Sequence, residues 1–353
     1  MLYYHVQFTS DLEDNVRFLM VCLSFFIFSS CSEILVPPSS TNSNVEDFEF
    51  AWTIIDSIYP LLEYKNIDWK TIHTTYRLRA RQADGDEFYP VLFDLLAELK
   101  DPHVYFLNLG KGLIFPHIGT RYLRDKDAYS PIVVREYFDH PFRSACQGKV
   151  EYGIHRDSIG YIYIATFNGK ALMNDFKNVM RAIAGTKALI IDVRRNSGGL
   201  VENIETVVSK FIASPMQHLS VYLKGNKPAT PRSPIQPDIS IPRYTGKVVI
   251  LINGTTISGG EVLAEFMRQL PAVTLLGDTT DGAGCNDIEE DIEGDYFLPS
   301  GKYIHIGSTY WLRTDGIPFE WNGIPPDVYL PQTGSDIVNG RDKQLELALT
   351  LLR

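Results

Sequence analysis

The chain has 353 residues, of which 44% are hydrophobic, so it is long enough to bury one large core or two modest ones. Its formal net charge of −10 comes without a basic stripe or a block of like charges, which argues against nucleic acid as a partner. The four cysteines form no C-x-x-C pair and no cysteine/histidine spacing typical of zinc ligation. A structural metal is therefore not expected.

An uncharged apolar run, FLMVCLSFFIF, occupies residues 18–28 and is too short to cross a bilayer comfortably. Arg17 precedes it, and small residues follow it before Cys31. The end of the run, F-S-S-C-S-E, resembles the lipobox of bacterial lipoproteins. The pattern predicts an export signal over residues 1–31, with Cys31 lipidated and the protein anchored to a membrane of the cell envelope, in the periplasm or at the outer membrane. A buried N-terminal helix is the alternative.

A stretch rich in Pro, Ser and Asn, residues 32–44, has the composition of a flexible tether. From Val45 to Leu99 apolar residues recur at spacings of three and four, and Asp68 opens one of the helical stretches. Residues 45–103 are therefore predicted to form a small helical domain.

Pro102 ends the helical pattern immediately before His103. A lone histidine after a helix is usually a surface or capping residue, but histidine is also the commonest general base near neutral pH. Val104 to Leu107 indicates a strand, which places His103 at an element boundary. We interpret residues 104–157 as an irregular β connection, with a strand-like run at 131–137.

The remainder of the chain, residues 158–353, alternates strand and helix patterns and predicts a layered α/β core. Its first units are a strand at 159–167, an amphipathic helix at 172–183 and a buried strand at 188–193. That strand runs into Gly198-Gly199, followed by a helix. Paired glycines let backbone amides approach a ligand, although glycine is also common in ordinary βα turns.

Two later regions lack a helical pattern. Six prolines mark residues 214–245 as a long loop, and residues 296–312 predict two strands around a glycine-containing turn. If the protein is exported, Cys146 and Cys285 could form a disulfide, which the sequence does not decide.

Ser258 lies between a buried strand and a helix. Val248 to Ile252 predicts the strand, and Ser258 with Glu261 fits the capping box S-x-x-E, so a helix cap is the simplest interpretation. The alternative is a nucleophile, because a serine at a strand-to-helix turn is exposed beside helix N-terminal amides that can hold a developing oxyanion.

Five segments, in this order, resemble the tail-specific, or C-terminal processing, serine peptidases, and within them the tricorn-core branch. They are LKDPHV (99–104), IDVRRNSGG (191–199), LINGTTISGGE (251–261), LLGDTTDGAG (275–284) and FEWNGIPPDV (319–328). The resemblance covers the chain from about Val45 onward. It implies an N-terminal helical bundle followed by a ClpP/crotonase-like α/β core, and hydrolysis of peptides or unfolded proteins without a metal or organic cofactor.

The resemblance also implies catalytic roles. Ser258 would be the nucleophile of an acyl-enzyme mechanism, His103 its general base and Glu320 the acid that orients the imidazole. In the branch with a serine-lysine dyad a lysine occupies the position of Ala283, and alanine cannot carry a proton. The base is therefore expected to be His103.

The oxyanion hole would be formed by the backbone amides of Gly198, Gly199 and Gly259. Arg194 and Asn196 match fixed polar positions of the same motif and are expected to shape the turn.

The stretch between His103 and Ile159 is too short for the peptide-binding PDZ module that many relatives insert, so capture of a substrate C-terminus by such a module is not expected. Two other functions stay open. One is a catalytically silent ligand- or lipid-binding lipoprotein of the same superfamily, and the other is a crotonase-like enzyme acting on thioesters.

Overall fold

The computed structural model describes residues 43–108, 110–169, 171–286 and 294–353. The described residues belong to one compact unit. The predicted export signal, Cys31 and all but the last two residues of the predicted tether lie outside them. No helix in the described ranges has both the length and the apolar character needed to cross a membrane.

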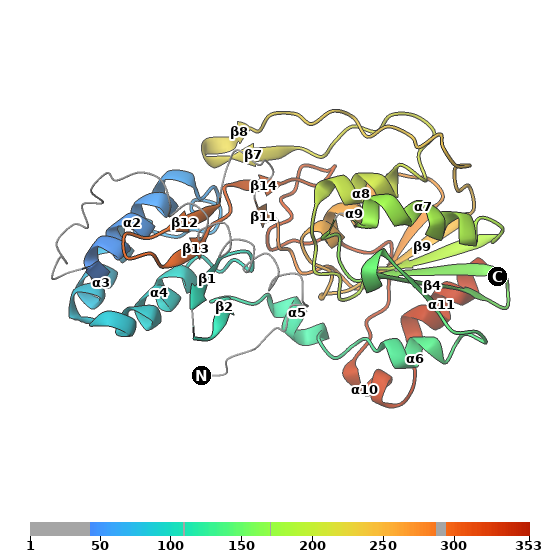
Figure 1. The fold of residues 1–353 in the computed structure, drawn as a ribbon, viewed down its shortest axis with the longest axis horizontal. Coiled ribbons are helices and arrows are strands. Elements are labelled where there is room, and N and C mark those ends of the chain that lie inside the picture. Colours follow the sequence, from blue (N-terminus) through green and yellow to red (C-terminus); the bar gives the residue numbers. More distant parts are fainter. Residues whose placement is uncertain (1–42, 109, 170, 287–293) are drawn as a thin grey trace, which may run out of the picture. The chain divides into compact units, whose positions relative to one another are not determined.

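Three helices begin the described chain, as the apolar spacing predicts: α2 (Ser43–Ile58), α3 (Trp69–Gln82) and α4 (Phe88–Ala97). The Asp68 carboxylate caps α3 by accepting a hydrogen bond from the Thr71 N–H at 3.1 Å. Apolar side chains of α2 and α4, including Phe48 and Leu92, are completely buried against one another. Figure 1 shows these helices in blue and cyan.

A small antiparallel sheet lies against these helices, in the strand order β12-β13-β1-β2. Its strands are β1 (Tyr105–Asn108), β2 (Gly112–Ile114), β12 (Asp295–Phe297) and β13 (Tyr303–His305). Phe106 of β1 and Ile304 of β13 are paired in register and complete the apolar cluster of the helices. The strand predicted directly after His103 is confirmed.

The main sheet has seven strands in the order β15-β10-β9-β6-β5-β4-β3. They are β3 (Arg143–Ala145), β4 (Val150–His155), β5 (Ile159–Ile164), β6 (Ala188–Asp192), β9 (Lys247–Ile252), β10 (Val273–Gly277) and β15 (Val328–Tyr329). The five strands from β5 to β15 run parallel, and β3 and β4 are antiparallel additions at one edge.

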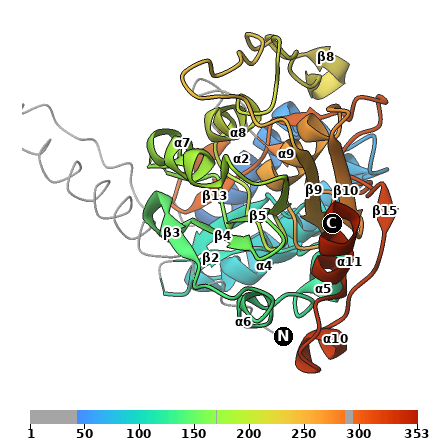
Figure 2. The ribbon, with the colours of Figure 1, turned by 90° about the vertical axis from the view of Figure 1, so that its right-hand side faces the viewer.

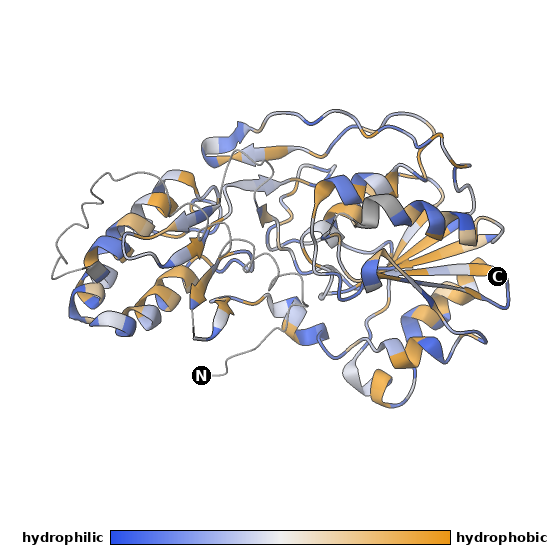
Figure 3. Ribbon diagram, in the orientation of Figure 1, coloured by the Kyte–Doolittle hydropathy of each residue, from blue (hydrophilic) through white to orange (hydrophobic). Residues whose placement is uncertain are grey.

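Helices cover both faces of this sheet, which explains why its central strands are continuous apolar runs. Ile191 and Ile250 point into a cluster with helices α7 (Ala171–Ile183), α8 (Val201–Val208) and α9 (Gly259–Met267). Their neighbours Ile190 and Leu251 point to the opposite face, where α11 (Lys343–Leu352) packs. Figure 2 shows the two helical layers, and Figure 3 shows the apolar strands between them.

A third sheet, in the order β11-β14-β7-β8, joins β11 (Cys285–Asn286), β14 (Thr309–Trp311), β7 (Val221–Leu223) and β8 (Lys227–Pro228). The proline-rich stretch 214–245 is therefore not entirely loop, because β7 and β8 lie within it. Residues 296–312 contribute to three strands rather than two. β12 and β13 belong to the small antiparallel sheet, whereas β14 belongs to the third sheet and pairs with β7.

The strand-like run at 131–137 was wrongly interpreted. The structure has helix α6 (Pro131–Arg135) there, preceded by α5 (Thr120–Asp125). A proline at the first helical position is favourable, and the buried Val133 and Val134 gain more from packing than β-branched residues lose in a helix. In the described ranges the remaining elements are α10 (Gly334–Val338) and three short 3-10 turns at Gly85–Glu87, Cys146–Gly148 and Lys224–Asn226.

The fold class expected from the sequence, N-terminal helices followed by an α/β sheet core, is confirmed. The carboxyl ends of β6 and β9, which pair directly, bring the glycine turn and Ser258 to the same edge of the main sheet.

Candidate active site

Ser258 occupies the turn between β9 and α9 and is the N-cap residue of the helix, as its sequence context predicts. Its φ of 52° and ψ of −121° lie in a region that non-glycine residues rarely adopt, at a cost of about 1–3 kcal/mol. Such strain is maintained only where neighbouring contacts impose it. The Ser258 N–H donates to Glu261 Oε2 at 3.0 Å, so the glutamate half of the capping box is formed.

Glu261 is a site residue whose importance the sequence signals only through the S-x-x-E spacing. It is completely buried and accepts three further hydrogen bonds, from Thr280 Oγ1 at 2.6 Å, Gly282 N–H at 2.8 Å and Ala283 N–H at 2.9 Å. Burial raises the pKa of Glu261 to about 7 although these donors oppose the shift. Glu261 therefore ties the Ser258 turn to the segment that carries Ala283.

The paired glycines contact Ser258 closely. A methyl group on Gly198 would stand 2.7 Å from Cβ and 2.9 Å from Oγ of Ser258, and one on Gly259 would stand 3.1 Å from the Gly199 nitrogen. The φ values of +82° at Gly198 and +128° at Gly199 also favour glycine. Both the conformation and the available space thus require glycine here.

The three amides expected in an oxyanion hole differ in availability. The Gly198 N–H already donates to Asn196 Oδ1 at 2.8 Å. The N–H groups of Gly199 and Gly259 have no hydrogen-bond acceptor within the described part of the chain. The geometry leaves these two amides, beside Ser258, as the available donors.

Arg194 and Asn196 hold the glycine turn against the neighbouring strands and the start of α11. The Arg194 guanidinium is completely buried and lies 2.6 Å from Asp192 Oδ2 and 2.8 Å from Asp342 Oδ2, the latter at the N-terminus of α11. Asn196 Nδ2 donates to the Ile164 carbonyl of β5 at 2.8 Å. Both side chains connect the turn to neighbouring elements and do not line the pocket described next.

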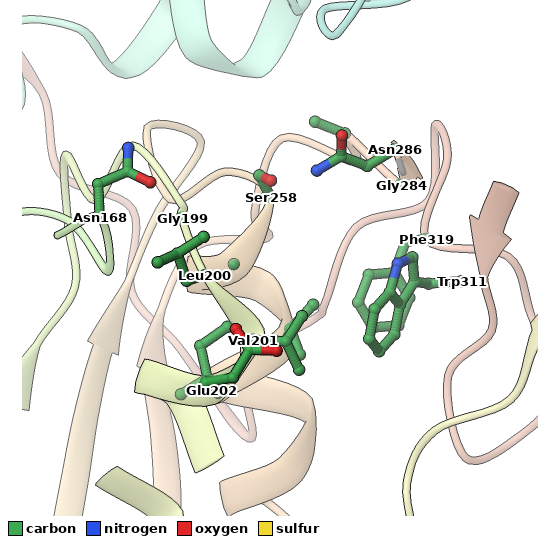
Figure 4. Close-up of a pocket in the computed structure, with 14 residues that line it drawn as sticks. Asn168, Gly199, Leu200, Val201, Glu202, Ser258, Gly284, Asn286, Trp311 and Phe319 are labelled. Carbon is green, nitrogen blue, oxygen red and sulfur yellow. The ribbon is translucent and has the colours of Figure 1, made fainter. Parts of the chain in front are cut away.

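A pocket of about 400 Å³ opens beside Ser258. Its apolar lining consists of Leu200, Val201, Ile204, Val262, Ala283, Trp311 and Phe319. Figure 4 shows Asn168 and Asn286 flanking Ser258, with Trp311 and Phe319 along one side. The arrangement can accommodate an apolar group next to the serine hydroxyl and the two available amides.

His103 and Glu320 are not among the described residues that line this pocket. Glu320 is completely buried, and its Oε1 lies 2.5 Å from Lys65 Nζ. Its Oε2 accepts the N–H of Gly284 at 2.9 Å, and Gly284 itself lines the pocket. Glu320 therefore lies immediately behind the pocket wall, paired with a lysine that the sequence did not single out.

His103 lies next to Asp101 in the same buried region. The ring nitrogen Nδ1 is 3.9 Å from Asp101 Oδ1, which is too far for a hydrogen bond, and it has no other partner in the described ranges. Burial lowers the pKa of His103 to about 4 although the Asp101 charge opposes the shift. The imidazole is therefore neutral near pH 7 and able to accept a proton.

The pKa of Glu320 moves in the opposite direction. Burial, followed by the charge of Asp101, raises it to about 8, and Lys65 opposes the shift. Burial would also lower the pKa of Lys65, but Asp101 and Glu320 outweigh it and the pKa is raised.

The possible disulfide does not form. Cys146 and Cys285 are both buried free thiols. Cys146 packs in the apolar cluster of α7 and the main sheet, whereas Cys285 packs with the N-terminal helices.

Comparison with known proteins identifies two domains. Residues 158–330 match peptidase family S41, and residues 41–97 match the tricorn protease C1 domain. Over 175 residues the chain is 26% identical to the carboxy-terminal processing protease CtpA of Bacillus subtilis, covering 49% of this chain and 35% of that protein. Over 201 residues it is 25% identical to the tricorn protease of Thermoplasma acidophilum, covering 56% of this chain and 17% of that protein.

Solved structures support the fold. A putative peptidase from Parabacteroides merdae has a TM-score of 0.73 at 25% identity, covering 88% of this chain and 96% of that chain. Mature CPAF complexed with lactacystin has a TM-score of 0.64 at 13% identity, covering 88% of this chain and 97% of that chain. The second likeness concerns the fold alone.

Proposed function

We propose, from the premise that this chain belongs to peptidase family S41, that it is a serine peptidase hydrolysing peptide bonds in peptides or unfolded proteins. The observation that carries the proposal is the position of Ser258. Its hydroxyl stands in a strained strand-to-helix turn, next to an apolar pocket and beside two amides that have no acceptor among the described residues. A helix cap alone requires neither the amides nor the pocket.

Ser258 Oγ would attack the substrate carbonyl and form an ester, while the Gly199 and Gly259 amides bind the oxyanion. His103 would take the serine proton and pass it to the leaving amine, and water would then hydrolyse the ester. His103 is not among the residues that line the pocket, and the mechanism requires its ring to lie within hydrogen-bond distance of Ser258 Oγ in the substrate complex. Catalytic hydrogen bonds are often long or unformed without substrate.

A fluorophosphonate probe and an unfolded protein substrate test this proposal. Ser258→Ala should abolish probe labelling and lower hydrolysis by about 10⁴-fold or more, by analogy with other serine peptidases. The control is Ser335→Ala, which removes an exposed hydroxyl in α10. Turnover of a thioester substrate that is unchanged in Ser258→Ala would instead support the thioester enzyme. A wild-type protein that the probe does not label and that copurifies with lipid would support the binding lipoprotein.

We further propose that the protein is exported and anchored through a lipid on Cys31. The support is the apolar run before Cys31 and the lipobox-like sequence around it. Metabolic labelling with an alkyne fatty acid should mark the wild-type protein and not Cys31→Ser. Cys22→Ser, within the apolar run, is the matched control and should label normally.

A further inference from the structure

We infer that Asp101 is the carboxylate that orients His103, and that Lys65 is a positioning residue that holds Asp101 and Glu320 in place. This inference rests on the proposed peptidase function, because it assigns positioning residues to the proposed base. It also gives the N-terminal helical segment, which contributes Lys65, a direct part in the site.

Asp101 is fixed on both oxygens. Its Oδ1 accepts the backbone N–H of His103 at 2.8 Å, and its Oδ2 accepts the Tyr59 hydroxyl at 2.7 Å. The carboxylate is completely buried. Because Asp101 Oδ1 accepts the backbone N–H of His103 itself, the carboxylate is held beside the residue that carries the ring.

The imidazole presents a buried nitrogen to this carboxylate. His103 Nδ1 is buried and has no hydrogen-bond partner in the described ranges, although 16% of the side chain is exposed. The exposed part of the ring is therefore not Nδ1. A histidine that acts as a general base through one nitrogen is commonly oriented by a carboxylate that accepts a hydrogen bond from the other. A shortening of the 3.9 Å separation from Asp101 Oδ1 by about 1 Å would form that hydrogen bond.

Glu320 is engaged elsewhere. One oxygen pairs with Lys65 and the other accepts the Gly284 amide. To orient His103, Glu320 would have to give up one of these two contacts and leave Lys65 Nζ or the Gly284 amide without it, which is costly for a buried polar group.

Lys65 connects the two carboxylates. Its Nζ lies 2.5 Å from Glu320 Oε1 and 3.6 Å from Asp101 Oδ2. It also donates to the Tyr59 hydroxyl at 2.7 Å and to the Leu99 carbonyl at 2.9 Å. Both oxygens of Asp101 and the lysine are thus held in one network, and the side chain of Lys65 is completely buried.

The charge states agree with this geometry. Burial would raise the pKa of Asp101, but Lys65, His103 and the Tyr59 hydrogen bond outweigh it and lower the pKa. The pKa of Glu320 is raised. The surroundings of Asp101 therefore favour its charged form, whereas burial disfavours the charged form of Glu320.

The charged and titratable groups acting on His103 are Asp101, Lys65 and His305. Nδ1 of His305 lies 2.7 Å from Asp295. Asp101 raises the pKa of His103, and Lys65 and His305 lower it. Removing Asp101 and removing Lys65 should therefore shift the titration of the base in opposite directions, which a purely structural role for these residues would not do.

The experiment measures the second-order rate of fluorophosphonate labelling of Ser258 against pH in full-length protein. Asp101→Asn should slow labelling by about 10³-fold or more, as expected for the loss of an orienting carboxylate. It should also move the acidic limb of the pH profile, where the rate falls as His103 is protonated, to lower pH. Glu320→Gln should slow labelling by less than about tenfold. Lys65→Met should move the acidic limb to higher pH.

Lys302→Met is the matched control for Lys65→Met. Lys302 also pairs with a buried aspartate, Asp47, at 3.0 Å, but it lies outside this network. Its loss should leave the pH profile unchanged. If Asp101→Asn does not fold, Tyr59→Phe tests the same carboxylate by removing one of its hydrogen bonds, and labelling should slow by about tenfold with the acidic limb in its wild-type position.

A larger loss of labelling in Glu320→Gln than in Asp101→Asn would overturn the inference. Acidic limbs that move together in Asp101→Asn and Lys65→Met would also overturn it. Failure of the proposed function looks different, because the wild-type protein would then not label at Ser258. If the wild type labels and His103→Gln does not, while both Asp101→Asn and Tyr59→Phe label at the wild-type rate, only the orienting role is wrong.

Discussion

Ser258 and its neighbouring amides come from the carboxyl ends of two adjacent parallel strands, β6 and β9. His103, Asp101 and Glu320 instead come from a segment after α4 and from a loop near the end of the chain, and Lys65 lies between α2 and α3. The first region is assembled by one sheet and the turns directly attached to it. The second exists only because segments distant in sequence meet around a buried lysine.

The difference teaches that the two halves of the proposed site are stabilised by different contacts, and that they meet at residues 282–284, whose amides bind Glu261 and Glu320. The Ser258 turn is held by backbone conformation, by Glu261 and by the Arg194 ion pairs. The His103 region is held by Lys65, Tyr59 and a few backbone contacts. A mutation away from residues 282–284 should therefore act mainly on its own half, and the predictions below examine each half in turn.

The largest expected effect is on stability in the Ser258 half. Arg194→Met would leave the buried carboxylates of Asp192 and Asp342 without a cation, at a cost of about 3–5 kcal/mol in the free energy of unfolding. Urea unfolding measures this. Arg195→Met, the neighbouring exposed arginine, should cost less than about 0.5 kcal/mol. Equal losses in the two variants would mean that the ion pairs do not support the turn.

The next effect is a pH dependence in the His103 half. The pKa of His103 is about 4 in the folded protein and 6.5 in the unfolded chain, so between these values the unfolded state binds more protons. Stability should rise with pH through this window, and the contribution of His103, about 3 kcal/mol, should be lost as pH falls from 6.5 to 4. Urea unfolding of wild type and His103→Gln from pH 4 to 7.5 isolates it. The exposed His140, changed to Gln, is the control, and parallel curves for all three proteins would contradict the prediction.

A third effect concerns the glycine turn. Gly198→Ala places a methyl group 2.9 Å from Ser258 Oγ at a φ of +82°, so the serine or the turn must shift. Fluorophosphonate labelling should slow by about a hundredfold, and the geometry of the His103 half should stay unchanged. Gly185→Ala, where the added methyl meets nothing within 4 Å, should label at the wild-type rate. A fast-labelling Gly198→Ala would show that the close approach is not needed.

The smallest effect tests the contact between the helical segment and the Glu320 loop. The Tyr64 hydroxyl donates to the Glu320 carbonyl at 3.2 Å and accepts from Asn322 Nδ2 at 2.8 Å. Because Tyr64 is partly exposed, Tyr64→Phe should cost only about 1 kcal/mol or less. Thermal unfolding measures it, and Tyr329→Phe, an exposed tyrosine on β15, is the comparison. A loss of several kcal/mol would mean that this contact is essential to the His103 half.

The Ser258 half was largely predictable from the sequence. Continuous apolar runs predict parallel strands, and the residues directly after them, Gly198-Gly199 and Ser258, must lie near the sheet edge where those strands end. The bond from Glu261 to the Ser258 amide is also contained in a four-residue pattern, but the contacts of Glu261 with Thr280, Gly282 and Ala283 are not. What could not be predicted is which amide stays available, because the bond from Gly198 to Asn196 depends on the details of the turn.

The His103 half was not predictable in the same way. Lys65 lies in an ordinary polar stretch between two helices, and nothing local distinguishes it from an exposed lysine. Its burial depends on Glu320, far away in the chain. Asp101 belongs to the LKDPHV segment, but nothing in the sequence indicated that its carboxylate has a role. Val133 and Val134 suggested a strand because both are β-branched. Their burial against the rest of the protein favours helix α6 instead, and a short sequence pattern does not show that burial.

Glu261 also sets a dimension of the pocket. One carboxylate holds the Ser258 amide on one segment and the Gly282 and Ala283 amides on another, and Ser258 and Ala283 both line the same cavity. The spacing of these segments is therefore determined by the length of a glutamate side chain, so an aspartate would draw them together by about one carbon–carbon bond, roughly 1.5 Å. The size of group that this pocket accepts is in this sense controlled from behind the cavity, by a residue that is not among those lining it.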